Sequence, residues 1–369
     1  MSVEIKVENL KKKYGKVVAV EGISFNVLPG ELFALLGPSG AGKTTTVNLI
    51  AGIIKPDEGE VWIDGFNVTK FKPQQRDCSM VFESYALYPH FTVFENMAFP
   101  LKSNVRKAQY TPDMIDKIVQ ETAKILDIVD LLNRYPKELS GGQKQRVGLG
   151  RALVRRPKLF IMDEPIAHLD AKLRHHMRGE LKKIQENIGI STILATPDYN
   201  EVVAMAHRAA IVSNGKIEQI GTPLDLYMYP VNETVAKSIG DPPINLIKCR
   251  VRVENNIMEI YNDVFSIPVN DQIRKRIESS GNQEITLGMR PKDLTVETDI
   301  QKASFGAEVY VFEPLGTEAV VSLSLQGNII KTICPTNYRL RIGDKVGLNF
   351  AMEKAYLFDA TGGKALPYL

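Results

Sequence analysis

The chain has 369 residues, 44% of them hydrophobic, and its 46 basic side chains nearly balance 43 acidic ones to leave a formal charge of +3. The length favours two domains, because a single hydrophobic core rarely serves more than about 250 residues. The small charge excludes the basic excess of proteins that bind nucleic-acid phosphates, so we expect no nucleic-acid partner. Three scattered cysteines exclude a disulfide framework and a Cys-x-x-Cys pair, which suits a reducing compartment.

Membrane segments are not expected. A spanning helix needs about 18 consecutive apolar residues, and the sequence contains no such run. The first residues, MSVEIKVENLKKKYG, also lack the apolar stretch of a secretion signal.

Residues 1–240 are predicted to form an α/β domain around a largely parallel sheet, because short apolar runs alternate with helical patterns. The runs at 31–37, 158–164 and 192–196 are continuously apolar, as buried central strands are. Between the first two, Thr111 is a suitable helix cap and Pro112 a suitable first residue. Apolar residues then follow helical spacing at Ile115, Ile118, Val119, Ile125, Leu126 and Val129.

Residues 241–369 have a different pattern, beginning after Gly240-Asp241-Pro242-Pro243. Short alternating segments are separated by Gly, Asn and Asp turns, which predicts a small all-β barrel. The expected strands are residues 248–253, 285–290, 307–312, 319–325, 328–333 and 345–350.

A phosphate-binding loop of the Walker A type is predicted at GPSGAGKTT, residues 37–45, between the strand at 31–37 and a helical segment. Its glycines allow backbone N–H groups to converge on a phosphate, and the following helix N-terminus adds positive potential. Lys43 would reach the β- and γ-phosphates of ATP, and the Thr44 hydroxyl would bind Mg²⁺. The nucleotide-binding residues predicted here are Gly37, Ser39, Gly40, Gly42, Lys43, Thr44 and Thr45.

Two carboxylates follow the strand at 158–164. Asp163 and Glu164 would lie at the carboxyl end of this strand, the edge where open α/β sheets bind ligands. Asp163 can hold Mg²⁺, and Glu164 can act as general base toward an attacking water. With Lys43, they are the predicted catalytic residues of a nucleotide hydrolase.

A second glycine motif, LSGGQ, places Ser140, Gly141, Gly142 and Gln143 directly before a helix and upstream of the Asp-Glu strand. With the phosphate loop, it makes the chain resemble the ATP-binding cassette (ABC) ATPases over its whole length. The resemblance implies a head-to-tail dimer in which Ser140 to Gln143 contact the ATP held by the partner's phosphate loop. It also implies that Tyr14 stacks on adenine and that Asp170 communicates across the dimer.

The second domain makes the resemblance more specific. GDPPINLI, LGMRPKDL, VFEPLGTEAVVSL and YLFDATGGKAL are similar to the OB-like (TOBE) regulatory domain of maltose-type import ATPases. That resemblance implies a cytoplasmic ATPase subunit on the inner face of a permease, which receives solute from an external binding protein. A helical subdomain is then expected at about 84–157, where residues 84–101 either grip the permease or form subdomain core.

Two positions depart from the family pattern. Glu83 stands where the family has a glutamine that approaches Mg²⁺, so it could bind the metal while adding negative charge. Pro197 stands where the family has a histidine that donates a hydrogen bond to the γ-phosphate, and proline has no donor. Loss of one such donor typically slows hydrolysis by about 10²–10³-fold.

We therefore expect that the site built on Lys43 binds ATP but hydrolyses it poorly. Because the Ser140–Gln143 motif is intact, the chain can still complete a partner's site, which favours a heterodimer with a second ATPase over a slow homodimer. Carbohydrate is the expected solute, with polyamines, phosphate esters and other small solutes as alternatives for a homodimeric import ATPase.

Other functions are less well supported. The histidines lack metal-ligand spacing, so no structural zinc is expected, and no Gly-x-Ser-x-Gly motif indicates a serine hydrolase. A soluble ABC ATPase acting on DNA or ribosomes would need long heptad arms or a second cassette. A structural partner that binds nucleotide without turning it over remains a further alternative.

Overall fold

The computed structural model describes residues 2–82, 87–102, 110–167, 170–297, 299–325 and 327–368. It divides into two compact units, residues 1–223 and 224–369. Residues 224–240 thus pack with the second unit, and the predicted domain boundary at 240/241 stays a prediction. Among the described residues, no helix is both long and apolar enough to cross a membrane.

The first unit is built on a six-stranded sheet in the order β10-β9-β3-β8-β7-β6. Strand β3 pairs in parallel with β8 and β9, β7 pairs in parallel with β8 and β6, and β10 is the antiparallel edge strand. Every residue of β3, β7 and β8 is buried, so the three predicted central strands are confirmed. The strands are β3 (Leu32–Leu36), β6 (Cys78–Val81), β7 (Leu159–Asp163), β8 (Ser191–Thr196), β9 (Arg208–Ser213) and β10 (Lys216–Gly221).

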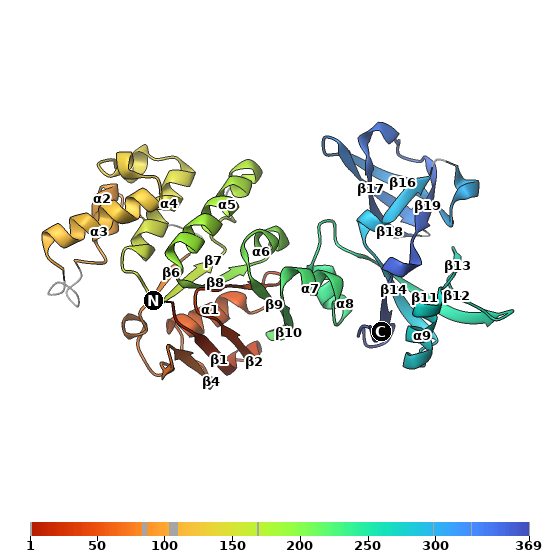
Figure 1. Cartoon of the computed structure of the whole chain (residues 1–369), viewed down its shortest axis with the longest axis horizontal. Helices are drawn as coiled ribbons and strands as arrows, with labels where there is room; N and C mark the ends of the chain where they lie inside the picture. Colours follow the sequence, from red (N-terminus) through yellow and green to blue (C-terminus); the bar gives the residue numbers. More distant parts are fainter. Residues whose placement is uncertain are drawn as a thin grey trace. The chain divides into compact units, whose positions relative to one another are not determined.

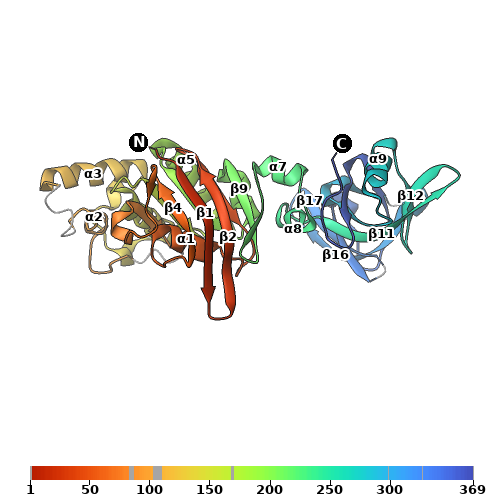
Figure 2. The same ribbon diagram turned by 90° about the horizontal axis from the view of Figure 1, so that it is seen from below.

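A second, antiparallel sheet has the order β2-β1-β4-β5. Its first two strands form a long hairpin that Figure 2 shows in red and orange. One hydrophobic core contains residues of both sheets together with Val47, Leu49 and Ile50 of α1 (Lys43–Ala51), the helix that follows β3. The strands are β1 (Ile5–Tyr14), β2 (Val17–Val27), β4 (Glu58–Ile63) and β5 (Phe66–Asn67).

Three helices, α2 (Val93–Ala98), α3 (Pro112–Ile125) and α4 (Gly141–Leu153), pack on one another and lie together in Figure 1. Helix α3 begins as predicted, with the Thr111 hydroxyl accepting from the Met114 N–H. Its predicted apolar face is only partly right, because Ile125 and Val129 are exposed while Thr122 and Ala123 are buried. The helix ends at Ile125, so Leu126 and Val129 do not belong to its apolar face. Helices α5 (Ala171–Ile188) and α6 (Tyr199–Met205) flank β8 in the sequence.

The second unit contains two five-stranded antiparallel sheets, in the orders β13-β12-β11-β14-β20 and β15-β19-β16-β17-β18. Buried side chains from both sheets form one core, and all six predicted strands are present. The expected α/β nucleotide-binding fold followed by an OB-like β domain is therefore confirmed. The strands are β11 (Asn245–Glu254), β12 (Ile257–Tyr261), β13 (Ser266–Pro268), β14 (Glu284–Met289), β15 (Leu294–Glu297), β16 (Phe305–Pro314), β17 (Glu318–Leu325), β18 (Asn328–Pro335), β19 (Lys345–Phe350) and β20 (Tyr356–Asp359).

Helices in this unit were not expected from its alternating pattern. Helix α9 (Asp271–Ser280) is capped by Asn270, which accepts from the Ile273 N–H, and buries Ile273 and Ile277 at helical spacing. The short helices α7 (Pro223–Met228) and α8 (Glu233–Ser238) precede the first strand.

A buried arginine ties residues 227–239 to the β-sheets. Arg290, only 1% exposed, donates to the carbonyl oxygens of Tyr227, Ala236 and Ile239. Its guanidinium also lies 4.1 Å from the ring centroid of Tyr227 and 5.0 Å from that of Tyr356. These contacts explain why the two short helices pack with the second unit.

Candidate functional site: a phosphate loop facing two carboxylates

The predicted phosphate loop connects β3 to α1, and two of its glycines are sterically required. A Cβ atom on Gly37 would lie 2.1 Å from the Val212 carbonyl oxygen. Gly42, the N-cap of α1, has φ +104°, a conformation that L-residues rarely adopt. The loop backbone therefore lies closer to its neighbours than a larger residue would permit.

Lys43 is almost completely buried against this loop. Its ammonium group donates to the carbonyl oxygens of Gly37 at 2.9 Å and Pro38 at 3.0 Å, and lies 3.9 Å from a carboxylate oxygen of Glu164. Burial lowers the pKa of Lys43, and the charges of Glu164 and Asp163 oppose this shift. The lysine is thus held between the loop and the carboxylates at the end of β7, the strand on the far side of β8.

The Thr44 hydroxyl donates to Asp163 Oδ1 across 3.2 Å. Thr44 is the second residue of α1, and the buried Asp163 is the last residue of β7, so the sheet brings together two oxygens from distant parts of the chain. Mg²⁺ prefers oxygen ligands and usually keeps water and phosphate oxygens in its remaining positions. The hydroxyl and carboxylate pair fits such an ion.

Glu164 has an unusual backbone conformation, with φ +49°. Its N–H donates to the Ala195 carbonyl oxygen, which fixes the residue against β8. A non-glycine residue in this region costs about 1–2 kcal/mol and persists only where surrounding contacts impose it. This strain marks Glu164 as a constrained position, a feature that no sequence pattern revealed.

Pro197 lies exposed directly after β8. The next N–H group, that of Asp198, donates to the Thr196 hydroxyl at 3.0 Å. The Asp198 side chain also accepts from Arg178 at 2.6 Å and from the Asn200 N–H, which makes Asp198 the N-cap of α6. Neither Pro197 nor the following amide therefore offers a free donor at this edge.

The signature residues Ser140 to Gln143 begin α4. The Ser140 hydroxyl accepts from the Gln143 N–H, and the Gln143 side chain accepts from the Ser140 N–H, a reciprocal helix cap. Ser140, Gly142 and Gln143 line an open cavity of about 560 Å³ together with Arg146 and His176. In the described part of the chain, no hydrogen bond or ion pair joins Lys43 to Ser140.

The remaining predicted residues lie as follows. Tyr14 ends β1 with 49% of its surface exposed. Ser39 is exposed and Thr45 half-buried, Gly40 lies in the loop between them, and Gly141 is exposed at the start of α4. Asp170 caps α5 by accepting from the Leu173 N–H. Glu83 lies outside the described residues.

The segment at 84–101 is described from residue 87 onward. Its rings form a cluster of Tyr88, His90, Phe91 and Phe99. The fully buried Asn96 side chain hydrogen-bonds the backbone of Tyr88, Phe91 and Thr92, so part of the segment is subdomain core.

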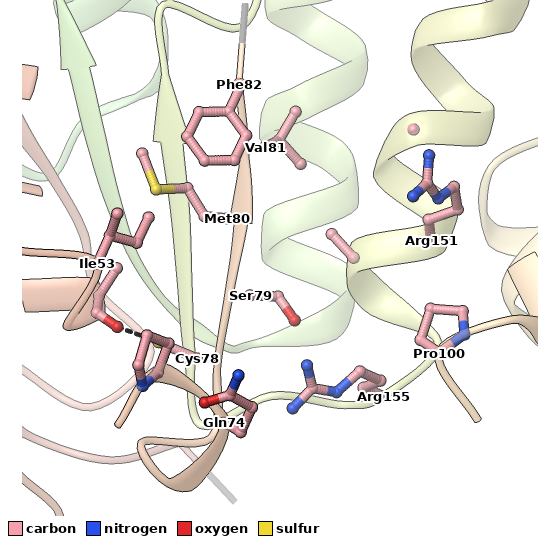
Figure 3. A pocket seen from close by; sticks show the side chains of 14 residues that line it. Ile53, Gln74, Cys78, Ser79, Met80, Val81, Phe82, Pro100, Arg151 and Arg155 are labelled. Atoms are coloured by element: carbon pink, nitrogen blue, oxygen red, sulfur yellow. Dashed lines mark hydrogen bonds between the residues drawn. The ribbon is translucent and has the colours of Figure 1, made fainter. Parts of the chain in front are cut away.

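Beside this cluster lies a groove of about 420 Å³. Figure 3 shows Met80, Val81 and Phe82 on one wall, with Arg151 and Arg155 across from them. The Arg151 guanidinium lies 4.6 Å from the Tyr88 ring centroid, and burial lowers the pKa of Arg151. The groove combines exposed apolar surface, including Phe82, with two cationic side chains.

Sequence reasoning missed the polar network behind Pro197, formed by Arg178, Asp198 and Glu201. It also missed Gln145, a buried residue of the signature helix that donates to the Pro165 carbonyl oxygen next to Glu164. Pro165 directly follows the Asp163-Glu164 pair, so the sequence marks one end of this contact. Gln145 lies 20 residues away in the sequence, and no pattern marks it.

Comparison with known proteins identifies the family. The ABC transporter family model matches residues 20–167, and the TOBE domain model matches residues 287–358. The trehalose/maltose import ATP-binding protein MalK of Thermococcus litoralis is 40% identical over 98% of this chain and 99% of its own length. The chain belongs to the ATP-binding subunits of multiple-sugar ABC importers.

Two further proteins agree with this assignment. The multiple sugar-binding transport ATP-binding protein MsmK of Streptococcus mutans is 39% identical, over 97% of this chain and 98% of its own length. Among solved structures, the dimeric post-hydrolysis state of the ATP-binding cassette MJ0796, bound to ADP and Pi, is 30% identical. It covers 59% of this importer subunit and 98% of its own chain, with a TM-score of 0.52. The predicted importer family and the ABC ATPase activity are thereby confirmed.

Proposed function

We propose that this subunit binds MgATP between its own phosphate loop and the Ser140–Gln143 motif of a second ATPase subunit, and that dimer closure drives a carbohydrate permease. The observation that carries the proposal is the convergence of Lys43, Thr44, Asp163 and Glu164 at one edge of the sheet. The names of the related import subunits support a sugar as the solute.

Each residue at this edge has a distinct role in the proposal. Lys43 exchanges the carbonyl oxygens of Gly37 and Pro38 for the β- and γ-phosphates of ATP. Thr44 and Asp163 hold Mg²⁺, which supplies charge neutralisation to the phosphates. Glu164 accepts a proton from the attacking water, and its fixed backbone restricts where the carboxylate lies. Tyr14, exposed at the end of β1, stacks on adenine.

The signature residues serve the partner subunit's nucleotide. Ser140, Gly142 and Gln143, at the N-terminus of α4, line an open cavity, and a helix N-terminus favours an anion. Asp170 is the N-cap of α5 and follows β7, the strand that ends at Asp163. We assign it to communication between the two subunits. The related cassette solved as a dimer bound to ADP and Pi supports a dimer of ATPase subunits.

Hydrolysis at this chain's own site is proposed to be slow. Pro197 has no donor for the γ-phosphate, and the Asp198 N–H is already hydrogen-bonded to Thr196. Losing one preorganised donor typically lowers the rate by about 10²–10³-fold. We therefore propose a heterodimer, in which the intact Ser140–Gln143 motif of this chain completes a fully active ATP site on the other subunit.

The permease is proposed to dock at the groove beside Tyr88, which places the subunit on the cytoplasmic face of the cell membrane. The groove offers apolar surface at Phe82 and cationic side chains at Arg151 and Arg155 (Figure 3), and it lies next to the segment predicted to contact a permease. The external solute-binding protein then acts on this subunit only through the permease.

ATP turnover by the purified chain tests the proposal. We expect MgATP binding with little hydrolysis, and we expect Pro197→His to raise the rate by about 10²-fold or more. Glu164→Gln in the Pro197→His background should abolish the gain, which ties it to this site. Ordinary turnover by the unmodified chain, or no gain in Pro197→His, would contradict the impaired site. Failure of Lys43→Ala to weaken MgATP binding would contradict the nucleotide site itself.

A further inference from the structure

Glu201 is a buried carboxyl group behind the edge where ATP is proposed to bind. It lies on α6, four residues after Pro197, and only 2% of its surface is exposed. Its Oε2 atom has no hydrogen-bond partner within the described part of the chain. Buried carboxyl oxygens without a partner are rare and call for an explanation.

The other contacts of this carboxyl group lead to the loop that carries Pro197. The Thr196 hydroxyl hydrogen-bonds the Glu201 carboxyl group and also accepts from the Asp198 N–H at 3.0 Å. The Glu201 N–H donates to the Asp198 carbonyl oxygen. Glu201 thus contacts the residues on both sides of Pro197.

The charges around Glu201 are unbalanced. Its own loop presents Asp198, the end of β7 presents Glu164, and α5 presents Arg178, while β8 contributes only the Thr196 hydroxyl. Arg178 is already paired with Asp198 at 2.6 Å. Burial raises the pKa of Glu201 to about 7, the hydrogen bond from Thr196 lowers it, and Asp198 and Glu164 add to the rise.

We propose that Glu201 is a proton-controlled positioning residue for the loop Thr196–Asp198. The neutral carboxyl group fits the buried space and holds the loop through Thr196. The ionised group repels Asp198 and Glu164, so the loop and the catalytic edge lose their fixed arrangement. The affinity of this site for MgATP therefore falls as the solution changes from mildly acidic to mildly alkaline.

This inference rests on the proposed function only in requiring that MgATP binds at this edge. Its test is the affinity of the full chain for MgATP, measured by calorimetry from pH 6 to pH 8.5. Three proteins are compared: the unmodified chain, Glu201→Gln and Glu31→Gln. Glu31 is a buried carboxylate paired with Arg208 next to the opposite end of β3, and it has no place in the nucleotide site.

We expect the affinity of the unmodified chain and of Glu31→Gln to fall by about fivefold or more over this range. Glu201→Gln should lose this fall except for the part caused by the titration of ATP, because its amide cannot ionise. Titration of ATP itself affects all three proteins equally. If Glu201→Gln folds poorly, Glu201→Asp replaces it, and its profile should shift along the pH axis relative to the unmodified chain.

Parallel profiles for the unmodified chain and Glu201→Gln would overturn the inference while leaving MgATP binding intact. An unshifted profile for Glu201→Asp would overturn it in the same way. Absence of MgATP binding by every variant at every pH would instead overturn the proposed nucleotide site, and this inference with it.

Discussion

Thr44 Oγ1 and Asp163 Oδ1 lie 3.2 Å apart, although 119 residues separate them in the chain. The contact exists because β3 and β7 are both neighbours of β8 in the parallel sheet, so their carboxyl ends reach the same edge. Thr44 Oγ1 and Asp163 Oδ1 are the two oxygen atoms that we propose bind Mg²⁺.

Asp163→Asn should weaken nucleotide binding only when Mg²⁺ is present. The amide keeps the shape of the side chain but removes the charge that binds the cation, and we expect at least about tenfold lower affinity for MgATP. With Mg²⁺ chelated, affinity should be equal or higher, because a negative charge near the phosphates is gone. Fluorescence anisotropy of a labelled ATP measures both. Asp113→Asn, on the surface of α3, is the control, and an equal loss with and without Mg²⁺ would contradict the prediction.

Gly37→Ala should disrupt the phosphate loop. The added methyl group would lie 2.1 Å from the Val212 carbonyl oxygen, so the backbone must shift, at a cost of about 1–3 kcal/mol in unfolding free energy. Binding of ATP should fall with it. Gly179→Ala, at an exposed position of α5, is a matched control, because a methyl group there meets no described atom within 4 Å. Chemical denaturation and nucleotide binding of the two variants should differ; equal behaviour would count against the steric explanation.

Arg290→Met should destabilise the second unit and release residues 224–240. Methionine fills much of the volume but leaves the carbonyl oxygens of Tyr227, Ala236 and Ile239 without their donor, which costs at least about 3 kcal/mol. Limited proteolysis should then cut within residues 224–240. Arg250→Met, at an exposed arginine of β11, controls for the loss of charge. Resistance to proteolysis in Arg290→Met would show that other contacts hold the segment.

Stability should depend on pH through Glu201. Its pKa rises from an ordinary 4.5 to about 7, so the folded protein binds more protons than the unfolded chain between these values. The free energy of unfolding therefore falls as pH rises from 4.5 to 7 and levels off above that, with a total contribution of roughly 3 kcal/mol. Urea unfolding at pH 5, 6, 7 and 8 measures this. Glu201→Gln should remove most of the decrease, and an unchanged slope in that variant would refute the assignment.

Local sequence patterns predicted much of the architecture because each depends on chemistry within a short stretch. Continuous apolar runs marked β3, β7 and β8, whose residues are all buried. Alternation and turn residues marked six strands of the second unit. The same patterns were wrong or incomplete at two places. They missed helix α9 within the β region, and they assigned to the apolar face of α3 both Ile125, its last residue, and Val129, which follows the helix; both are exposed.

The candidate site divides in the same way. Gly37 to Thr45, Ser140 to Gln143, and Asp163-Glu164 are contiguous motifs. The roles of the first and third were predicted from residue order, and the role of the second from the resemblance to ABC ATPases. Arg178, Asp198 and Glu201 come from two helices and a loop, and nothing in their spacing distinguishes them from surface charges. Only packing around β8 buries Glu201 and turns ordinary residues into a coupled group.

The sequence by itself determined the family, the phosphate loop, the carboxylates and the missing donor at position 197, because those features are fixed by residue type and local order. The tertiary structure decided which oxygen atoms meet, as those of Thr44 and Asp163 do. It also decided that the backbone of Glu164 is constrained and that the carboxyl group of Glu201 is buried. These depend on distances between segments far apart in the chain and on the removal of solvent. Burial and proximity arise only when the sheet assembles.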